Sequence, residues 1–171
     1  MTDLDLFADP VDLTAALIDI ESPSFHEEEI ADAVEKQLRT LEHVSVQRFG
    51  NTVVARTNFG LEQRVVLAGH IDTVPLADNT PHRIASDSEG ADILHGCGAV
   101  DMKSGMACYL NAFARLAEPG KSAYDLTLIA YEAEEVATKY NGLFHLERDH
   151  PELLAGDIAP VSYTHLRAHE T

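Results

Sequence analysis

The sequence predicts a layered α/β domain with a mostly parallel central sheet. Two short apolar runs, at residues 64–68 and 126–131, have the continuous hydrophobic character of strands that are buried on both faces. Segments with helical spacing of apolar residues lie before the first run and between the two runs. Alternation of buried strands with helices is typical of domains in which helices pack on a parallel sheet.

Two helices are expected in the N-terminal part. Asp9 followed by Pro10 is typical of an N-cap and a first helical position, and predicts a helix through about Ile20. Ser24 and Glu27 have the spacing of a capping box, which predicts the start of a second helix. One apolar face marks this second helix, formed by Ile30, Val34, Leu38 and Leu41.

Shorter elements follow. Strands are expected at residues 44–46, where apolar and polar residues alternate, and at 52–55, after an Asn-bearing turn. A loop rich in Asp, Pro, Ser and Asn is expected over residues 76–92. Four apolar residues spaced by four, three and four predict a helix that ends before Pro119. These residues are Met106, Leu110, Phe113 and Ala117.

The composition is that of an ordinary globular chain of one domain. Its 171 residues are 45% hydrophobic and 24% charged, and no apolar run approaches the roughly 20 residues of a membrane-spanning helix. The net charge of −17 disfavours binding to nucleic acid or to anionic membranes. The acidic N-terminus does not resemble a secretory signal, and the two cysteines suit a reducing compartment. A cytoplasmic location is therefore expected.

Polar side chains follow both buried runs. His70 and Asp72 come directly after the first run, and Glu134 and Glu135 come after the second. Asp101 lies between them, where a glycine-rich stretch leads into the later helix. Since ligands of such sheets gather beyond the carboxyl ends of the strands, we expect these three groups of side chains to converge.

Each group alone has a plain structural explanation. His70 and Asp72 fit a loop histidine hydrogen-bonded to an acid, adjacent glutamates fit a solvated turn, and Asp101 fits a helix N-cap. The chemical explanation is a metal-binding imidazole oriented by the carboxylate behind it. Adjacent carboxylates can then divide cation binding and proton transfer between them, and a third can bridge two metal ions. Glu132 is an alternative candidate to Glu134 and Glu135, both for binding the cation and for transferring the proton.

Three motifs resemble a known family. GHIDTVP, GCGAVDMKSG and AYEAEE are similar to the three N-terminal motifs of the dinuclear zinc hydrolases that include aminoacylase, acetylornithine deacetylase and glutamate carboxypeptidase. The likeness extends from the first expected helix to Ala159. It implies a three-layer, zinc-peptidase-like catalytic domain that binds two divalent ions. These ions would be Zn²⁺, and Co²⁺ could substitute for them.

The resemblance also implies a role for each candidate residue. His70 and Glu135 would each bind one of the two ions, and Asp101 would bridge both, followed by a cis peptide bond. Asp72 would orient His70, and Glu134 would be the general acid/base. The implied reaction is metal-assisted hydrolysis of the amide bond of a small N-acylated amino acid.

The family pattern is only partly present. Residues 1–159 are expected to be the N-terminal part of the catalytic domain, and residues 160–171 a non-native tail without family counterpart. The family's further ligands, a glutamate in a Gly-Glu-Pro motif and a late histidine, have no match here, nor does the lid domain that forms its homodimers. We therefore expect activity in the full-length protein and near inactivity in these 171 residues. The alternatives are another deacylase or peptidase of the family and, in a different class, a non-catalytic cation-binding α/β module.

Overall fold

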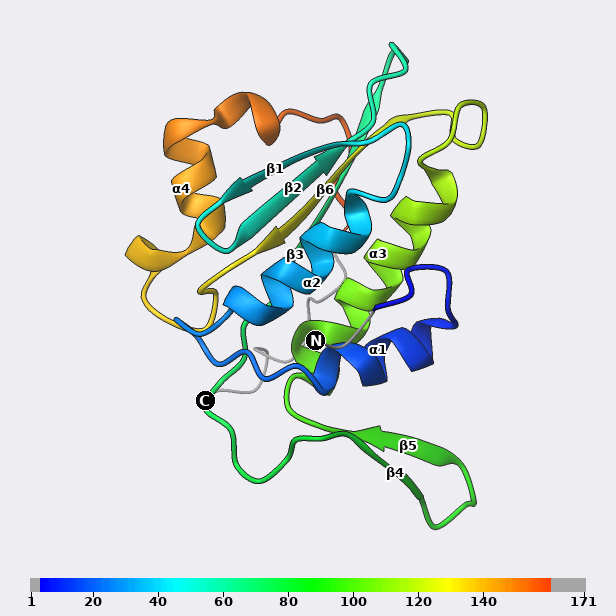
Figure 1. Cartoon of the computed structure of the whole chain (residues 1–171), viewed down its shortest axis with the longest axis vertical. Coiled ribbons are helices and arrows are strands. Elements are labelled where there is room, and N and C mark those ends of the chain that lie inside the picture. Colours follow the sequence, from blue (N-terminus) through cyan, green and yellow to red (C-terminus); the bar gives the residue numbers. More distant parts are fainter. Residues whose placement is uncertain (1–3, 161–171) are drawn as a thin grey trace.

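The computed structural model describes residues 4–160, and these form three layers (Figure 1). A four-stranded sheet lies in the middle. Helices α1 (Pro10–Ile18), α2 (Glu28–Leu38) and α3 (Ser104–Leu116) cover one face, and α4 (Gly142–Asp149) covers the other. The expected α/β class is confirmed. None of the described helices combines the length and the apolar character needed to cross a membrane.

The sheet is mixed. Its strand order is β1 (Ser45–Phe49), β2 (Thr52–Arg56), β6 (Asp125–Tyr131) and β3 (Arg64–His70). β3 and β6 are parallel over their whole length, whereas the pairs β1–β2 and β2–β6 are antiparallel. The sheet of the described residues is thus less parallel than expected. The two residues between β1 and β2 include Gly50 at φ +61° and form a tight hairpin, which accounts for the antiparallel pairing of β1 with β2.

Alternate residues of the central strands point into two separate cores. Val53, Ala55 and Leu128 pack among the residues of α1, α2 and α3. Val54, which lies between Val53 and Ala55, and Ile129, which follows Leu128, pack in the core beneath α4. Side chains of a strand alternate between the faces of a sheet, so this pattern explains why the strands have uninterrupted apolar sequences.

A β-hairpin replaces part of the expected loop. β4 (Arg83–Ser86) and β5 (Asp92–His95) pair with each other only, and they project from the body of the domain (Figure 1). The prediction of a loop over residues 76–92 is wrong here. The hairpin does not pack on the main core, and its apolar side chains stay exposed, Ile84 by 59% and Ile93 by 42%. It therefore lacks the pattern of a strand with one buried face.

The start of the second helix also differs from the expectation. α2 begins at Glu28 without a side-chain cap. The hydroxyl of Ser24 donates to Asp72 instead, and the carboxylate of Glu27 accepts from the backbone of Ala133. The capping-box prediction is wrong, because both side chains bind distant parts of the chain. The predicted tail, apart from Pro160, lies outside the described residues.

Candidate metal centre

The ends of β3 and β6 lie side by side. The two strands are parallel and in register, so that His70 pairs with Tyr131. The N–H of Ile71 continues this pairing by donating to the carbonyl of Tyr131 at 2.9 Å. The segments that follow the two strands therefore begin at one edge of the sheet.

The carboxylate of Asp72 joins these two segments and is wholly buried, with 0% of the residue exposed. Its Oδ1 accepts from the N–H of Glu134 at 3.0 Å and lies 3.2 Å from Nδ1 of His70. Its Oδ2 accepts from the N–H of Glu135 at 3.1 Å and from the hydroxyl of Ser24 at 2.7 Å. Burial alone would raise the pKa of Asp72, but these hydrogen bonds lower it. Asp72 therefore stays ionised and ties His70 to the turn of the two glutamates.

The imidazole of His70 is buried between two carboxylates. Nδ1 faces Asp72, and Nε2 lies 2.9 Å from Oδ1 of Asp101. Burial would lower the pKa of His70, but the hydrogen bonds to Asp72 and Asp101 outweigh it and raise the pKa to about 9. With Nδ1 facing Asp72, Nε2 is the nitrogen that is placed to bind a cation.

Asp101 lies in a short irregular helical segment, Ala99–Lys103, that leads into α3. The peptide bond between Asp101 and Met102 is cis, as the resemblance implied. Gly98 begins the segment at φ +73°, and a Cβ at this position would lie 2.7 Å from Cγ2 of Thr73. Only glycine fits this turn without displacing its neighbour.

The side chain of Lys103 anchors the same segment, a contact that the sequence did not reveal. Only 2% of Lys103 is exposed, and its ammonium donates to the carbonyls of Leu17, at 2.9 Å, and Ile20, at 2.8 Å. These carbonyls belong to the end of α1 and the residues just beyond it. Burial lowers the pKa of Lys103 to about 8, although Asp19 partly opposes this effect. The lysine thus fixes the Asp101 segment to α1.

The two glutamates complete the cluster. One ligand atom from each of His70, Glu134 and Glu135 lies within 4.8 Å of the others. Burial raises the pKa of Glu135, and the charge of Asp101 adds to this effect. Glu132 lies apart from this group, since its carboxylate accepts from the N–H of Asn51 at 3.0 Å. The structure therefore brings together all five candidate residues predicted from the sequence, whereas Glu132, the alternative candidate, lies outside the cluster.

The donor atoms of this cluster suit a divalent cation. They comprise one imidazole nitrogen, backed by the buried carboxylate of Asp72, and the carboxylates of Asp101, Glu134 and Glu135. Zinc and cobalt bind such mixed nitrogen and oxygen ligands. Asp101 contacts the imidazole of His70 but is not part of the three-residue group within 4.8 Å.

An open groove of about 500 Å³ adjoins the cluster. Asp101 and Glu135 line it together with the apolar side chains of Val74, Ile93 and Val100. This volume falls in the range of small-molecule sites, so a substrate has room beside the candidate metal ligands.

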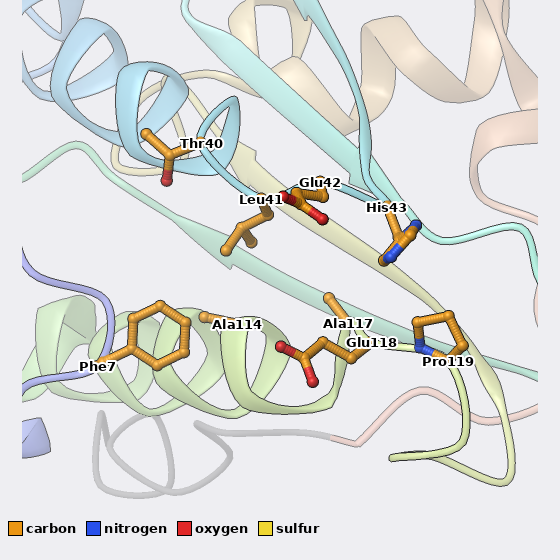
Figure 2. A pocket seen from close by; sticks show the side chains of 9 residues that line it. All are labelled: Phe7, Thr40, Leu41, Glu42, His43, Ala114, Ala117, Glu118 and Pro119. Carbon is orange, nitrogen blue, oxygen red and sulfur yellow. The ribbon is translucent and has the colours of Figure 1, made fainter.

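A second cavity, of about 330 Å³, lies between the end of α3 and the segment that leads from α2 to β1 (Figure 2). Its lining combines the apolar side chains of Phe7 and Leu41 with the polar groups of Glu42, His43 and Glu118. It shares no residue with the metal cluster. The groove, and not this cavity, therefore adjoins the candidate metal ligands.

Residues 66–163 match Peptidase family M20/M25/M40. Succinyl-diaminopimelate desuccinylase from Corynebacterium glutamicum is 56% identical over 158 residues, which cover 91% of this chain and 42% of that protein. A putative succinyl-diaminopimelate desuccinylase from Mycobacterium tuberculosis is 50% identical over 157 residues, with the same two shares of 91% and 42%. The chain thus spans about two fifths of the length of these curated relatives.

Solved structures share the fold at low sequence identity. An M20 family metallo-carboxypeptidase from Sulfolobus solfataricus has a TM-score of 0.70 and 17% identity, covering 92% of this chain and 38% of its own. Aminopeptidase PepT from Bacillus cereus has a TM-score of 0.67 and 18% identity, covering 91% and 43%. These likenesses confirm the predicted fold class.

Proposed function

Because the chain belongs to peptidase family M20/M25/M40, we propose that the whole protein is a metal-dependent hydrolase that cleaves the amide bond of an N-acylated amino acid. One observation carries the proposal. His70, Glu134 and Glu135 bring ligand atoms within 4.8 Å of one another at the adjacent ends of β3 and β6. Family membership supplies the reaction class, and this cluster supplies the groups for it.

We assign the metal-binding roles as the family resemblance implies. His70 and Glu135 would each hold one of two divalent ions, and Asp101 would be shared between the two. We propose that the ions are Zn²⁺, with Co²⁺ able to substitute. Bound divalent ions would polarise the substrate carbonyl and make water more acidic at neutral pH. The remaining steps belong to side chains of the chain itself.

Glu134 is the proposed general acid/base. Its carboxylate takes a proton from the attacking water, whose oxygen forms the new bond to the substrate's carbonyl carbon. As the carbon–nitrogen bond breaks, Glu134 delivers this proton to the leaving amine. The hydrogen bond from its backbone N–H to Asp72 holds the residue beside His70. Asp72 also engages Nδ1 of His70, which leaves Nε2 as the nitrogen that would bind an ion.

The proposed substrate is N-succinyl-LL-2,6-diaminopimelate, which would yield succinate and LL-diaminopimelate in lysine biosynthesis. Support comes from the 56% and 50% identity to desuccinylases and from the motifs HIDTVPLADN and LTLIAYEAEEV. The second candidate within the family is a deacylase such as acetylornithine deacetylase. We further propose that the whole protein is a cytoplasmic homodimer formed through the lid domain that the family resemblance implies.

The test is an amide-hydrolysis assay of the whole protein with Zn²⁺ or Co²⁺. The substrates are N-succinyl-diaminopimelate, N-acetylornithine and a dipeptide, and the variants are Glu134→Ala and the neighbouring control Glu132→Gln. We expect Glu134→Ala to retain metal and to lose about 10²–10⁴-fold in kcat, and the control to stay active.

The outcomes separate the alternatives. Faster hydrolysis of acetylornithine than of succinyl-diaminopimelate would favour the second candidate. A whole protein that binds metal but hydrolyses none of the three substrates would overturn the enzymatic proposal in favour of a cation-binding module. The 171-residue chain, assayed in parallel, tests the expectation that it is nearly inactive.

A further inference from the structure

The segment that connects α1 to α2, residues 22–27, lies along the loop that follows β3. The hydroxyl of Ser22 donates to the carbonyl of Ile71 at 2.8 Å, and the carbonyl of Ser22 accepts from the N–H of Thr73 at 2.9 Å. The N–H of Ser24 donates to the carbonyl of Thr73 at 3.1 Å. This segment therefore holds the backbone on both sides of Asp72.

The same segment also reaches the turn after β6. Ala133 has φ +58°, a left-handed conformation that residues with a Cβ rarely adopt. The three successive N–H groups of residues 133–135 all donate to carboxylate oxygens: to Oε1 of Glu27 at 3.2 Å, to Oδ1 of Asp72 at 3.0 Å and to Oδ2 of Asp72 at 3.1 Å. Two buried acids thus fix the turn that carries both candidate glutamates.

The environment of Glu27 is unfavourable for a carboxylate that serves packing alone. Only 1% of the residue is exposed, and Oε2 is buried without a hydrogen-bond partner among residues 4–160. A buried polar atom without a partner destabilises a fold, and an apolar side chain of similar size would avoid this. The hydrogen bond that Oε1 accepts from Ala133 explains why an acceptor occupies the position.

We propose that Glu27 is a positioning residue of the candidate metal centre. Its carboxylate holds Ala133 in the left-handed conformation, and this directs Glu134 and Glu135 toward His70. The kinetic part of this inference rests on the proposed function, whereas the structural part does not. Displacement of a reacting group by about 1 Å can cost on the order of 10²-fold in rate, so the loss of this acceptor should reduce turnover.

Two substitutions separate the reach of the side chain from its charge. Glu27→Gln keeps an oxygen at the same distance from the backbone and removes the charge. Glu27→Asp keeps the charge, but its side chain is one methylene shorter and withdraws the acceptor from Ala133. Glu28→Gln and Glu28→Asp are the matched controls, because Glu28 is the next residue in sequence and is exposed.

The first measurement is amide hydrogen exchange of residues 133–135 in the 171-residue chain without metal. We expect Glu27→Asp to accelerate exchange of these amides at least tenfold relative to the amides of β6. We expect Glu27→Gln and both Glu28 variants to remain within about threefold of the original chain, since hydrogen-bonded amides exchange through local opening. Unchanged exchange in Glu27→Asp, or acceleration in Glu27→Gln alone, would overturn the inference.

The second measurement is kcat and KM of the whole protein. Glu27→Asp should lower kcat about 10–100-fold with bound metal retained and KM little changed, and Glu27→Gln should stay within about threefold. Adding Ala133→Gly to Glu27→Asp should recover part of the loss, because glycine adopts the left-handed conformation without strain. A role in packing alone predicts no such recovery, and its absence would contradict the positioning role.

The two proposals fail in different ways. A whole protein without amide hydrolase activity refutes the proposed function, and the exchange data then decide the role of Glu27. An active protein in which Glu27→Asp is as fast as Glu27→Gln refutes the positioning role and leaves the proposed function in place.

Discussion

Replacing Asp72 with asparagine should destabilise the domain by about 2–4 kcal/mol, and the structure explains the size of this effect. The carboxylate accepts from the N–H groups of Glu134 and Glu135, one on each oxygen. Asparagine offers one oxygen and one NH₂ group in the same space. Whichever way the amide is turned, one backbone N–H then faces another donor.

The magnitude follows from the two losses. A buried donor left without an acceptor costs about 1–3 kcal/mol. The surviving hydrogen bonds also change from charge-assisted to neutral, which removes about 1 kcal/mol more. Since a domain of this size is typically stable by about 5–15 kcal/mol, the variant should remain folded and measurable.

The assay is urea unfolding of the metal-free 171-residue chain, followed by circular dichroism, with the free energy of unfolding taken from the midpoint and slope. Asp87→Asn is the matched control. Asp87 also accepts from two backbone N–H groups, those of Glu89 at 2.8 Å and Ala91 at 2.9 Å, but in an exposed turn. Water can replace its hydrogen bonds, so its midpoint should not shift measurably.

Equal midpoints for Asp72→Asn, Asp87→Asn and the unsubstituted chain would refute the reasoning. Such a result would mean that the buried carboxylate does not hold the two amides. The assignment of Asp72 as the link between His70 and the glutamate turn would then fail as well.

Three further predictions concern pH, the buried lysine and a crowded glycine. The pKa of His70 is raised from 6.5 to about 9, so its stabilising effect is complete below pH 6.5 and is lost as the pH rises through 9. The metal-free chain should therefore lose about 1 kcal/mol of unfolding free energy between pH 6.5 and 8. The lowered pKa of Lys103 has the opposite effect on stability, but this effect is small over the same pH range. His70→Gln should abolish the loss. Lys103→Met should leave two carbonyls unpaired and destabilise the chain by about 2 kcal/mol in urea unfolding, whereas the exposed control Lys121→Met should have no measurable effect. Gly142→Ala should cost about 1–3 kcal/mol in the same assay, because the new Cβ would lie 2.0 Å from Oγ1 of Thr52, and an unchanged midpoint would show that this contact relaxes freely.

Local sequence patterns were sufficient to predict the positions of the main strands and of the candidate ligands. The runs that became β3 and β6 are apolar at nearly every position, because both faces of the sheet are covered. His70 and Glu135 were recognisable as polar residues that follow such runs. Their convergence then required only that the two strands be parallel neighbours, which the structure confirms.

Contacts between distant residues were not predictable in this way. Ser24 lies 48 residues before its partner Asp72, and Glu27 lies 106 residues before Ala133. From the sequence alone, the spacing of Ser24 and Glu27 fits a local capping box equally well. The partners of Lys103 are backbone carbonyls, which carry no sequence signal at all.

The charges of the cluster explain why its surroundings must be rigid. Asp72, Asp101, Glu134 and Glu135 crowd around a single imidazole, and their mutual repulsion favours separation of the segments that carry them. In the metal-free chain the raised pKa of His70 keeps its imidazole protonated at neutral pH. Its one positive charge offsets only part of this repulsion. The remainder must be resisted by the hydrogen bonds that fix the backbone, such as those from the N–H groups of Glu134 and Glu135 to Asp72. Ligands held in this way would not have to become ordered when a divalent ion binds, and this favours binding.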